Sequence, residues 1–469
     1  MSNKTDQFKE RIRSKKVAVL GIGVSNTPLI NFLWEIGVDI TGFDKSEEDK
    51  LGKTIEDFNK KGIKLSLGEG YLNKLRGFDV IFRTPGIRFD IPELVAEKER
   101  GAEITSEMEV FFDLCPAQII AVTGSDGKTT TTTLIYNILC EEGYKCWLGG
   151  NIGTPLLSRI EEISETDKVV LELSSFQLHT MKKSPETAVI TNISPNHLDV
   201  HKSMEEYVDA KKNIFKYQNG KKGFGTPKLV LNYDNEATRE LAQEGSGEIV
   251  FFSRRQLLKE GAVLNNGTLA YRKGDREIKI VDSEDIVIPG VHNVENYLAA
   301  AAATIDCVKP ESIMRVATTF KGVEHRIELV RELNGVKFYN SSIDSSPSRT
   351  IAAMNTFKNK VILIAGGKDK GIGYDEIGES IADKVKCLVL IGATAPKIEK
   401  ALKEASDRTG KGKEIPVFIC STYEEVVRTA YENASDGDIV LLSPASTSFD
   451  MFRNFEERGR VFKDLVNKL

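Results

Sequence analysis

The chain has 469 residues, enough for about three domains at roughly 100–200 residues each. Its 64 Lys and Arg against 69 Asp and Glu give a formal net charge of -5, which argues against a dedicated nucleic-acid binder. The composition, 40% hydrophobic and 28% charged, is that of a globular protein, and no apolar run reaches the ~20 residues of a membrane span.

The six cysteines are scattered without a CxxC pair, which favours reduced thiols over a disulfide or zinc framework. The first residues, MSNKTDQFKERIRSKK, lack the apolar centre of a signal peptide. We therefore expect a cytoplasmic protein with no nucleic-acid partner and no membrane insertion.

Three short apolar runs, at residues 17–22, 118–123 and 360–365, predict buried parallel strands. Each is followed by glycine and then by a segment of helical character. This order is typical of open α/β sheets, which bind ligands at the carboxyl ends of their strands. We predict three α/β domains in series, with a less regular, turn-rich insertion between residues 219 and 290. The predicted domains are 1–116, 117–322 and 323–469.

In the first domain, the run GIGVSN (21–26) follows the first strand. Its glycines allow a tight turn, and Ser25 or Asn26 could cap the next helix. Asp44 ends the next strand, where a ribose or another ligand group could bind. Asn26 occupies the place of the third glycine of a dinucleotide-binding motif, so a turn without a ligand is an equal alternative. The Pro-Gly turn of FRTPGI (82–87) is a second place where a ligand could contact backbone amides.

The segment VTGSDGKTTTT (122–132) ends the second predicted strand and precedes an amphipathic helical run. A phosphate-binding loop needs glycines whose amides can point at oxygen, a helix N-terminus behind them, and a lysine. Gly124, Gly127, Lys128 and Thr129 supply these. We expect Lys128 to bridge the β- and γ-phosphates and the Thr129 hydroxyl to bind Mg²⁺. The loop is shorter than the generic GxxxxGK[ST] motif, so a turn with a surface lysine is the alternative.

Two further strand ends could complete a metal site. Glu172 follows an apolar run and places a carboxylate at the carboxyl edge of the sheet, where Mg²⁺ bound to phosphates would lie. After the next apolar run, His197, Asp199 and His201 form an HxDxH cluster. We favour magnesium coordination or orientation of a reacting group by His197 over a zinc site, because no third ligand motif follows. His201 is equally compatible with a solvated loop position.

The run MEEYVDAKKNIFKYQ (204–218) predicts an amphipathic helix with Tyr207 and Ile214 among its apolar positions. Composition alone would assign Lys211 and Lys212 to a solvated charged face.

Seven motifs resemble, in order and spacing, those of the ATP-dependent Mur ligases of peptidoglycan synthesis: TGSDGKTTTT, GGNIGTP, LELSSFQL, ITNISPNHLDVH, DAKKNIF, PGVHNVENYLAA and EHRIELV. The resemblance covers essentially the whole chain. It implies a Rossmann-like N-terminal domain for a UDP-substrate, a central P-loop ATPase-like domain with a mainly parallel sheet, and a Rossmann-like C-terminal domain for an amino acid. The GxGxS form of the first turn, LELSSFQL and the tail LLSPASTSFDMFRNFEERG favour the member that adds D-glutamate to UDP-N-acetylmuramoyl-L-alanine.

The resemblance also implies roles for single residues. Lys128, His197 and Lys211 would be catalytic. Thr129 and Glu172 would bind a first Mg²⁺ and His197 a second. Lys211 aligns with a lysine that CO₂ carbamylates in this family, which would turn a cation into an anion able to hold the second Mg²⁺; carbamylation requires the neutral amine. ATP would contact Gly124, Ser125, Asp126, Gly127, Lys128, Thr129, Thr130, Asn293, Asn296 and Arg326. The UDP-substrate would contact Val24, Ser25, Asp44, Lys45, Thr84, Pro85, Gly86 and Asn151, the last near the phosphates and the second metal, and D-glutamate would contact Lys370, Ser448 and Phe455.

At one place the chain departs from the family pattern. The family often reads NDSKAT where this chain reads NSSIDSSPSRT (340–350), so that Ser341 replaces an aspartate and Ile343 a lysine. Asp344 and Arg349 lie a few residues further on and are candidates to stand in for them.

The resemblance thus implies a monomeric, ATP-dependent, amide-forming ligase with two Mg²⁺ ions. Three alternatives remain open from the sequence. A ligase of the same superfamily could use another amino acid. A nucleotide-dependent binding module could close on a partner without forming a bond. An NAD(P)-binding oxidoreductase could be built on the first domain.

Overall fold

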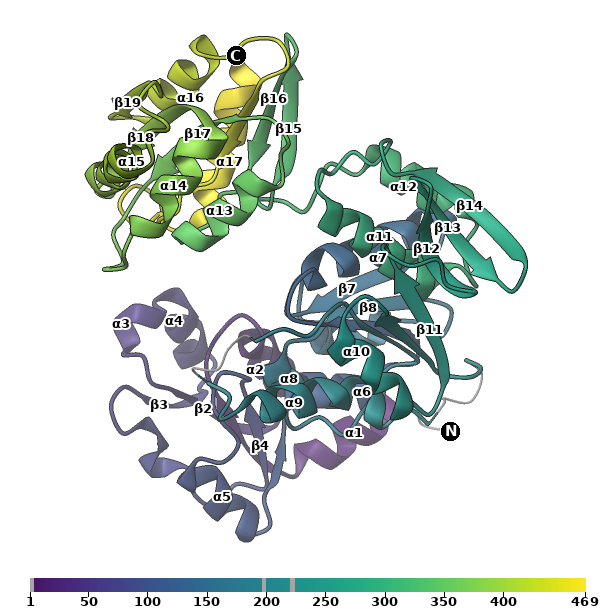
Figure 1. The fold of residues 1–469 in the computed structure, drawn as a ribbon. Coiled ribbons are helices and arrows are strands. Elements are labelled where there is room, and N and C mark those ends of the chain that lie inside the picture. The colour runs from purple at the N-terminus through teal and green to yellow at the C-terminus, as the bar shows by residue number, and fades with distance from the viewer. Residues whose placement is uncertain (1–3, 196–199, 220–223) are drawn as a thin grey trace. The chain divides into compact units, whose positions relative to one another are not determined.

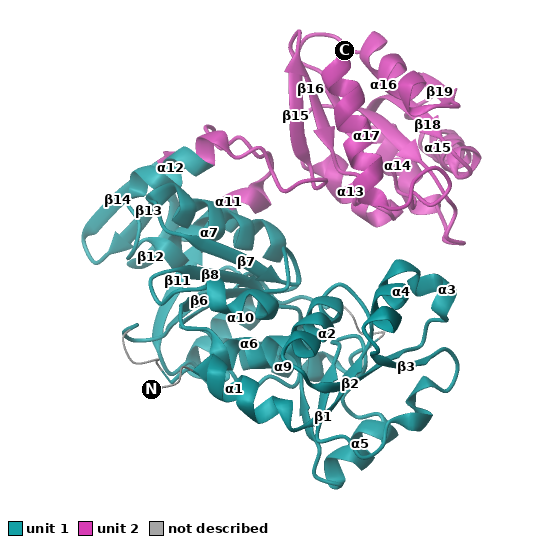
Figure 2. Ribbon diagram, turned by 180° about the vertical axis from the view of Figure 1, so that it is seen from behind, with its two compact units in different colours: residues 1–280, 295–316 teal, residues 281–294, 317–469 magenta. Residues whose placement is uncertain are grey.

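The computed structural model describes residues 4–195, 200–219 and 224–469. The chain forms three β-sheets with flanking helices, an α/β architecture (Figure 1). It divides into two compact units, residues 1–280 with 295–316, and residues 281–294 with 317–469 (Figure 2). The first unit holds two of the sheets and the second unit holds the third. Where each predicted domain begins and ends stays a prediction.

The first sheet has five parallel strands in the order β3-β2-β1-β4-β5. The predicted first strand is confirmed as β1, which is buried from Val17 onward because its side chains are apolar on both faces. The chain order reverses between β1 and β4, so the crevice at their carboxyl ends is the expected ligand position. The strands are β1 (Lys16–Leu20), β2 (Asp39–Asp44), β3 (Lys64–Leu67), β4 (Val80–Arg83) and β5 (Glu103–Thr105), and the helices are α1 (Lys4–Arg13), α2 (Asn26–Glu35), α3 (Glu48–Leu51), α4 (Lys53–Lys60), η1 (Tyr71–Lys74), α5 (Pro92–Glu99) and α6 (Glu107–Leu114).

The central sheet has nine strands in the order β14-β13-β12-β11-β10-β9-β6-β8-β7. Seven neighbouring strands of this sheet run parallel to one another, in the order β12-β11-β10-β9-β6-β8-β7. Strand β13 is antiparallel to β12. The second predicted strand is confirmed as β6. The strands are β6 (Gln118–Thr123), β7 (Cys146–Gly150), β8 (Lys168–Glu172), β9 (Thr187–Ile190), β10 (Lys228–Asn232), β11 (Glu248–Ser253), β12 (Glu260–Asn265), β13 (Thr268–Lys273) and β14 (Arg276–Asp282).

The helices associated with this sheet include α7, which follows the glycine-rich loop, and α9, which the sequence predicted from its apolar spacing. Tyr207 and Ile214 of α9 are buried, as expected, and Phe215 is buried beside them in sequence. The helices are α7 (Lys128–Glu142), η2 (Leu157–Glu162), α8 (Ser175–Leu178), α9 (Met204–Lys216), α10 (Glu236–Glu240), η3 (Leu241–Gln243), α11 (Val291–Thr304) and α12 (Pro310–Thr319).

The segment between residues 219 and 290 is more regular than the sequence suggested. It adds β10 and β11 to the parallel sheet and then extends the sheet with β12, β13 and β14. Asn266 and Gly267 join β12 to β13 with positive φ angles of 46° and 85°, the backbone of a tight hairpin turn. The turn at Asn266 and Gly267 is therefore a hairpin connection within the sheet.

One hydrophobic core extends from the first sheet to the central sheet. Val17, Phe112, Ile119 and Ile190 all belong to it. The first two sheets therefore share a core within the first unit.

The third sheet has six strands in the order β15-β16-β20-β17-β18-β19, parallel except for β15, which is antiparallel to β16. The third predicted strand is confirmed as β17. In the part of the chain that the structure describes, no helix has the length and apolar character needed to cross a membrane. The elements are β15 (Glu328–Leu333), β16 (Val336–Asn340), β17 (Val361–Gly366), β18 (Val385–Ile391), β19 (Val417–Cys420), β20 (Ile439–Leu442), α13 (Pro347–Asn355), α14 (Asp375–Lys384), α15 (Ala395–Thr409), α16 (Tyr423–Glu432) and α17 (Phe455–Lys468).

Candidate active site

The loop between β6 and α7 can be built only with glycine at two positions. Gly124 has a φ of +150°, and a Cβ there would collide with the hydroxyl of Thr191. Gly127 has a φ of +78°, and a Cβ there would collide with Oδ1 of Asn296. The amide of Asp126 donates to Oδ1 of Asn192 at 2.9 Å, which fixes the middle of the loop. This is the strand, glycine turn and helix N-terminus that a phosphate site requires.

The predicted phosphate ligands lie at the start of α7. Lys128 Nζ donates to the carbonyl oxygens of Gly124 at 3.0 Å and Ser125 at 2.9 Å, so its side chain folds back over the loop. Thr129 and Thr130 are half-buried in the same turn. The Ser125 hydroxyl is buried and lies 2.9 Å from the hydroxyl of Tyr207, so this side chain is committed to the protein.

Glu172 ends β8 beside this loop and is 1% exposed. Asn151 Nδ2 donates to its Oε1 at 2.8 Å, whereas its Oε2 is buried and has no hydrogen-bond partner. A buried carboxylate oxygen without a donor is costly, unless a cation binds there. This oxygen therefore fits a metal ligand.

Lys211 is the largest correction to the composition-based prediction of a solvated face. It is 1% exposed, and its Nζ donates to the carbonyl oxygen of Gly124 at 2.6 Å. The amine also lies 4.6 Å from the centroid of the Tyr207 ring. Burial, reinforced by repulsion from Lys128, lowers the pKa of Lys211 to about 6. At neutral pH the amine is uncharged, which is the form that carbamylation needs.

Its neighbour Lys212 does behave as predicted from composition. Its Nζ pairs with Glu244 at 2.8 Å, and this hydrogen bond raises the pKa of the lysine. One helical step thus separates a buried amine from a surface cation, because consecutive helix positions are about 100° apart.

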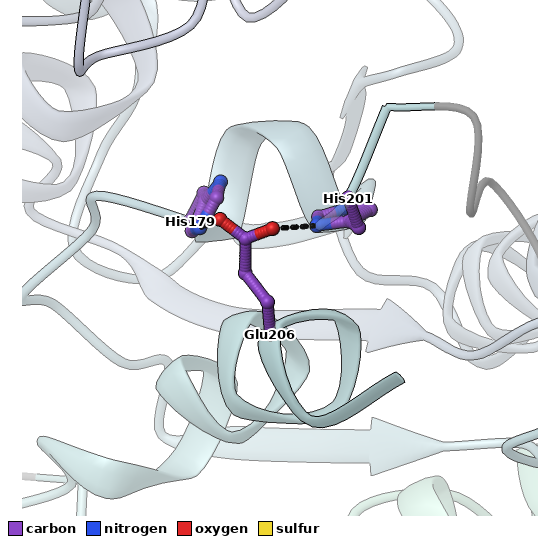
Figure 3. Close-up of side chains that lie close together, drawn as sticks. All are labelled: His179, His201 and Glu206. Atoms are coloured by element: carbon purple, nitrogen blue, oxygen red, sulfur yellow. Dashed lines mark ion pairs between the residues drawn. The ribbon is translucent and has the colours of Figure 1, made fainter. Parts of the chain in front are cut away.

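The predicted histidine cluster is only partly visible. His197 and Asp199 lie outside the described residues. His201 is 2% exposed, so the solvated-loop alternative is wrong. Its Nε2 lies 2.9 Å from the hydroxyl of Ser175, and its Nδ1 lies 3.9 Å from Oε2 of Glu206. His179 Nε2 lies 3.2 Å from the other oxygen of Glu206, so both rings face one carboxylate (Figure 3).

The sequence did not single out Glu206 or His179. Neither the position of Glu206 in the first turn of a helix nor the position of His179 after LELSSFQL indicates that the two side chains lie close together. Only the packing of α9 against α8 brings them together.

In the first sheet the three predicted segments meet at one edge. Asp44 accepts hydrogen bonds from the amide of Ile22 at 2.7 Å and the amide of Ser46 at 2.8 Å. A Cβ on Gly21, whose φ is +88°, would lie 2.6 Å from Cγ2 of Thr84. The turn after β1, the end of β2 and the turn after β4 are therefore in direct contact.

The remaining residues predicted here are accessible to different degrees. Val24 is 82% exposed, Lys45 is exposed, and Ser25, Pro85 and Gly86 border the same turns. The predicted side-chain cap of α2 is not made: Ser25 has a helical backbone conformation and gives no side-chain cap. Asn26 instead donates to the carbonyl oxygens of Leu20 and Gly21, at 3.0 and 2.9 Å.

Arg83 is a buried residue of this site that sequence reasoning missed. It is 4% exposed and donates to the carbonyl oxygens of Thr84 and Ile87, which holds the Pro-Gly turn in shape. Its second terminal nitrogen donates to the Thr180 hydroxyl, after α8, at 3.1 Å. Its place at the end of an apolar strand is the sequence feature that could have marked Arg83 as a residue of this site.

Asn293 and Asn296 lie on α11, in the second and first unit respectively. Both are buried, and Asn293 Nδ2 donates to the carbonyl oxygen of Pro289 at 2.6 Å. Asn296 Oδ1 accepts from the Thr131 hydroxyl at 3.2 Å, next to the glycine loop. Arg326 follows His325, which is buried and has a φ of 64°.

The predicted amino-acid contacts lie in the second unit. Lys370 is exposed, and its Nζ donates to the Ser345 hydroxyl at 3.3 Å. Ser448 is 3% exposed, and its carbonyl oxygen accepts from the amide of Phe452 at 2.9 Å. Phe455 packs edge-on against His325, with 6.0 Å between the ring centroids.

The segment that departs from the family pattern is built around Asp344. Asp344 is 7% exposed and accepts a hydrogen bond from the Ser443 hydroxyl at 2.9 Å; burial raises the pKa of its carboxyl. Ser341 is buried, and Arg349 donates to the carbonyl oxygen of Ile343 at 3.4 Å. That Asp344 and Arg349 stand in for the family residues stays a prediction.

A glycine-rich loop at the carboxyl edge of a parallel sheet, beside a buried carboxylate and a buried amine, defines a nucleotide-binding α/β protein. Three family models match the chain: the MurD-like N-terminal domain of Mur ligases over residues 15–106, the Mur ligase middle domain over 122–304, and the glutamate ligase domain of Mur ligases over 325–446. The chain belongs to the Mur ligase family.

Relatives from Acetivibrio thermocellus and Ruminiclostridium cellulolyticum are 66% and 63% identical over 469 residues, with 100% of both chains covered. Both are named UDP-N-acetylmuramoylalanine–D-glutamate ligase. The structure of UDP-N-acetylmuramate–alanine ligase from Thermotoga maritima matches with a TM-score of 0.57 at 19% identity, over 97% of this chain and 99% of that chain. A pseudomurein peptide ligase type C from Methanothermus fervidus matches with a TM-score of 0.52 at 21% identity, over the same shares. At these identities the two structures show a common fold.

Proposed function

We propose that this chain is an ATP-dependent ligase that adds D-glutamate to UDP-N-acetylmuramoyl-L-alanine in peptidoglycan precursor synthesis. The observation that carries the proposal is the meeting of Lys128, Glu172 and Lys211 around the phosphate loop. The full-length identity to relatives named for this reaction supports the choice of substrates. Membership of the Mur ligase family does not favour the oxidoreductase alternative.

The reaction needs an activated carboxyl group, because a carboxylate does not react with an amine in neutral water. Transfer of the γ-phosphoryl group from ATP to the carboxylate of the UDP-substrate gives an acyl phosphate and ADP. The amine of D-glutamate then attacks the acyl carbon, the C–O bond to phosphate breaks, and the amine loses a proton. No residue of the chain has to act as a covalent nucleophile.

The chain's own residues would neutralise the phosphates and keep water away. The amides of residues 124–129 and the N-terminus of α7 offer partial positive charge, and Lys128 adds a full one. Water would hydrolyse the acyl phosphate, so the site must exclude it during the reaction. Glu172 and Lys211 are both buried, which is consistent with a site that excludes water.

The residues present also fit two Mg²⁺ ions. Thr129 and Glu172 would hold one, and His197 with carbamylated Lys211 the other, since carbamylation turns a buried neutral amine into an oxygen ligand with negative charge. Bound Mg²⁺ supplies electrostatic stabilisation of the charge that develops on the transferred phosphoryl group. The buried, unpartnered oxygen of Glu172 and the lowered pKa of Lys211 are the observations behind this assignment.

The other ligands would bind at the remaining predicted positions. The turns after β1 and β4, with Asp44, would bind the uridine nucleotide, and Asn151 would lie near the reacting end. Asn293, Asn296 and Arg326 would contact ATP, and Lys370, Ser448 and Phe455 would contact D-glutamate. We infer a monomer that works in the cytoplasm.

The test is ADP release by the purified full chain with UDP-N-acetylmuramoyl-L-alanine, D-glutamate, ATP and Mg²⁺. We expect release that requires both the acceptor and D-glutamate, and a fall of at least about 100-fold in Lys128→Ala, equivalent to about 2.7 kcal/mol of lost stabilisation. Lys212→Ala is the matched control and should keep wild-type activity. ADP release that requires another amino acid would show that the chain is a ligase with a different substrate. ADP release that requires no amino acid would favour the nucleotide-dependent binding module.

A further inference from the structure

Arg88, after the Pro-Gly turn of the first sheet, contacts the segment that leads into α9. Its guanidinium donates to both oxygens of Asp90, at 2.9 and 3.0 Å, which orients the group. It then donates to Oε1 of Glu206 at 2.8 Å and to the carbonyl oxygen of Val200 at 2.8 Å. Lys202 Nζ adds a second link, to Asp90 at 2.6 Å. Charged hydrogen bonds thus join the first sheet to the start of α9.

These contacts are partly shielded from water. The side chains of Arg88, Asp90 and Glu206 are 24%, 29% and 19% exposed. The hydrogen bond from Arg88 lowers the pKa of Glu206 to about 2, so the carboxylate stays charged over the physiological range. Charge-assisted hydrogen bonds of this kind, including a bidentate pair, hold geometry better than exposed ion pairs do.

Glu206 is connected to the phosphate loop through α9 itself. It lies in the first turn, where its amide donates to the capping hydroxyl of Ser203 at 3.2 Å. The next residue, Tyr207, contacts Ser125 of the phosphate loop, and Lys211 lies one further turn along the same face as Tyr207. A shift at the start of α9 would therefore move the Lys211 amine relative to Gly124.

The group of His179, His201 and Glu206 could be taken for a metal site, because its three potential ligand atoms lie within 4.8 Å of one another. The contacts to Glu206 argue otherwise. Arg88 already donates to Oε1, and the amide of Lys202 donates to Oε2. A guanidinium at hydrogen-bond distance from the carboxylate opposes a second cation there. The carboxylate is thus the acceptor of an ion-pair network.

We propose that Arg88 is a positioning residue: through Glu206 it fixes the start of α9 against the substrate turn of the first sheet, and so sets the place of Lys211. This proposal rests on the proposed function, since Lys211 matters only if it serves the reaction. It assigns to Arg88 no contact with substrate. It predicts that the loss of Arg88 affects turnover and the Mg²⁺ requirement more than substrate affinity.

The experiment measures kcat, the KM of the UDP-substrate and the Mg²⁺ concentration for half-maximal rate, in wild type, Arg88→Ala, Arg88→Lys and Glu206→Gln. We expect kcat to fall about tenfold in Arg88→Ala, the equivalent of about 1.4 kcal/mol at 25 °C. The half-maximal Mg²⁺ concentration should rise several-fold and KM should change less than threefold. Arg88→Lys should recover only part of kcat, because an ammonium cannot bind Asp90 and Glu206 as a fork does.

Arg11→Ala is the matched control, because Arg11 also pairs with a glutamate of the first unit, Glu103 at 2.8 Å, away from α9. It should leave all three quantities unchanged. Binding of Arg88 to the substrate itself would raise KM alone, and this result would overturn the proposal. So would wild-type kinetics in a folded Arg88→Ala protein. If instead the wild type showed no D-glutamate-dependent ADP release, the proposed function would be the part that fails.

The double variant Arg88→Ala with Glu206→Gln separates positioning from general loss of stability. If Arg88 acts through Glu206, the double variant should lose no more kcat than Arg88→Ala alone. Additive losses would mean that the two residues act separately, and would contradict the proposal even if every variant unfolds at a lower temperature.

Discussion

The amine of Lys211 lies 2.6 Å from the carbonyl oxygen of Gly124, so a lysine from α9 closes on the backbone of the phosphate loop. The side chain is buried, and its Nζ also donates to the Thr123 hydroxyl at 3.4 Å. The contact joins two segments that are 87 residues apart in the sequence.

Lys211 should make stability depend on pH. Its pKa is about 6 in the folded chain and near the ordinary 10.5 when unfolded, so between these values the unfolded chain binds one more proton. The free energy of unfolding should therefore rise with pH across this window, by up to about 1.4 kcal/mol per pH unit from this group. Lys211→Met should lose that slope, as measured by urea unfolding in CO₂-free buffer without metal. Equal slopes in Lys211→Met and wild type would refute the assigned pKa; Lys212→Met should keep the wild-type slope.

Glu172→Gln should separate metal binding from folding. The amide keeps an acceptor for Asn151 but removes the charge, so the Mg²⁺ concentration for half-maximal activity should rise at least tenfold. Thermal stability should not fall, because a neutral group replaces a buried carboxylate that has one unpartnered oxygen. Glu162→Gln, at an exposed carboxylate paired with Arg159, serves as the control. An unchanged Mg²⁺ requirement would remove Glu172 from the metal site.

The two glycines that flank α7 offer a test of the phosphate loop. Gly127 and Gly143 both have positive φ, 78° and 105°, but only at Gly127 would a Cβ meet another group, Asn296. Both alanine variants should lose stability through backbone strain, about 1–3 kcal/mol. Gly127→Ala should lose more, and it alone should weaken binding of a non-hydrolysable ATP analogue in calorimetry. Equal analogue affinity in the two variants would show that the loop does not bind phosphates.

Lys370→Ala should raise the KM for D-glutamate at least about tenfold, because a charged hydrogen bond to a carboxylate contributes roughly 1.5–3 kcal/mol. The KM for ATP should stay the same, as measured by ADP release at saturating UDP-substrate. Lys400→Ala, on α15 of the same unit, is the control, since Lys400 pairs at the surface with Glu404 at 3.6 Å. An unchanged KM for D-glutamate would place the amino acid elsewhere.

Features encoded in short segments could be predicted from the sequence. The strand before Gly124, the helix after Lys128 and the strand end at Glu172 each depend on local apolar runs and glycines, and the structure has them at those positions. Asp44 ends β2 for the same reason. Parallel sheets place such strand ends along one edge, so the positions of the strands also indicated where candidate ligand-binding residues would lie.

Features that depend on packing could not be predicted from the residues alone. The helical period places Lys211 on the same face as Tyr207 and Ile214, but a lysine carries a charge that composition assigns to the solvent, so its burial could not be predicted from the residues alone. His201 was ambiguous because its burial depends on Ser175 and Glu206, which are distant or unremarkable in sequence. The role that we propose for Lys211 comes from the resemblance to the Mur ligases and not from its composition.

Residues 281–294 belong to the second unit, although the chain on both sides of them belongs to the first. The chain passes from one unit to the other at 280/281, 294/295 and 316/317, and α11 contributes residues to both. No single cut can therefore release either unit intact. A fragment ending at residue 322 would keep Ile286 and Ile288 but lose most of the unit to which they belong, and would leave apolar surface prone to aggregation. Expression of separate halves would need circular permutation or two coordinated excisions.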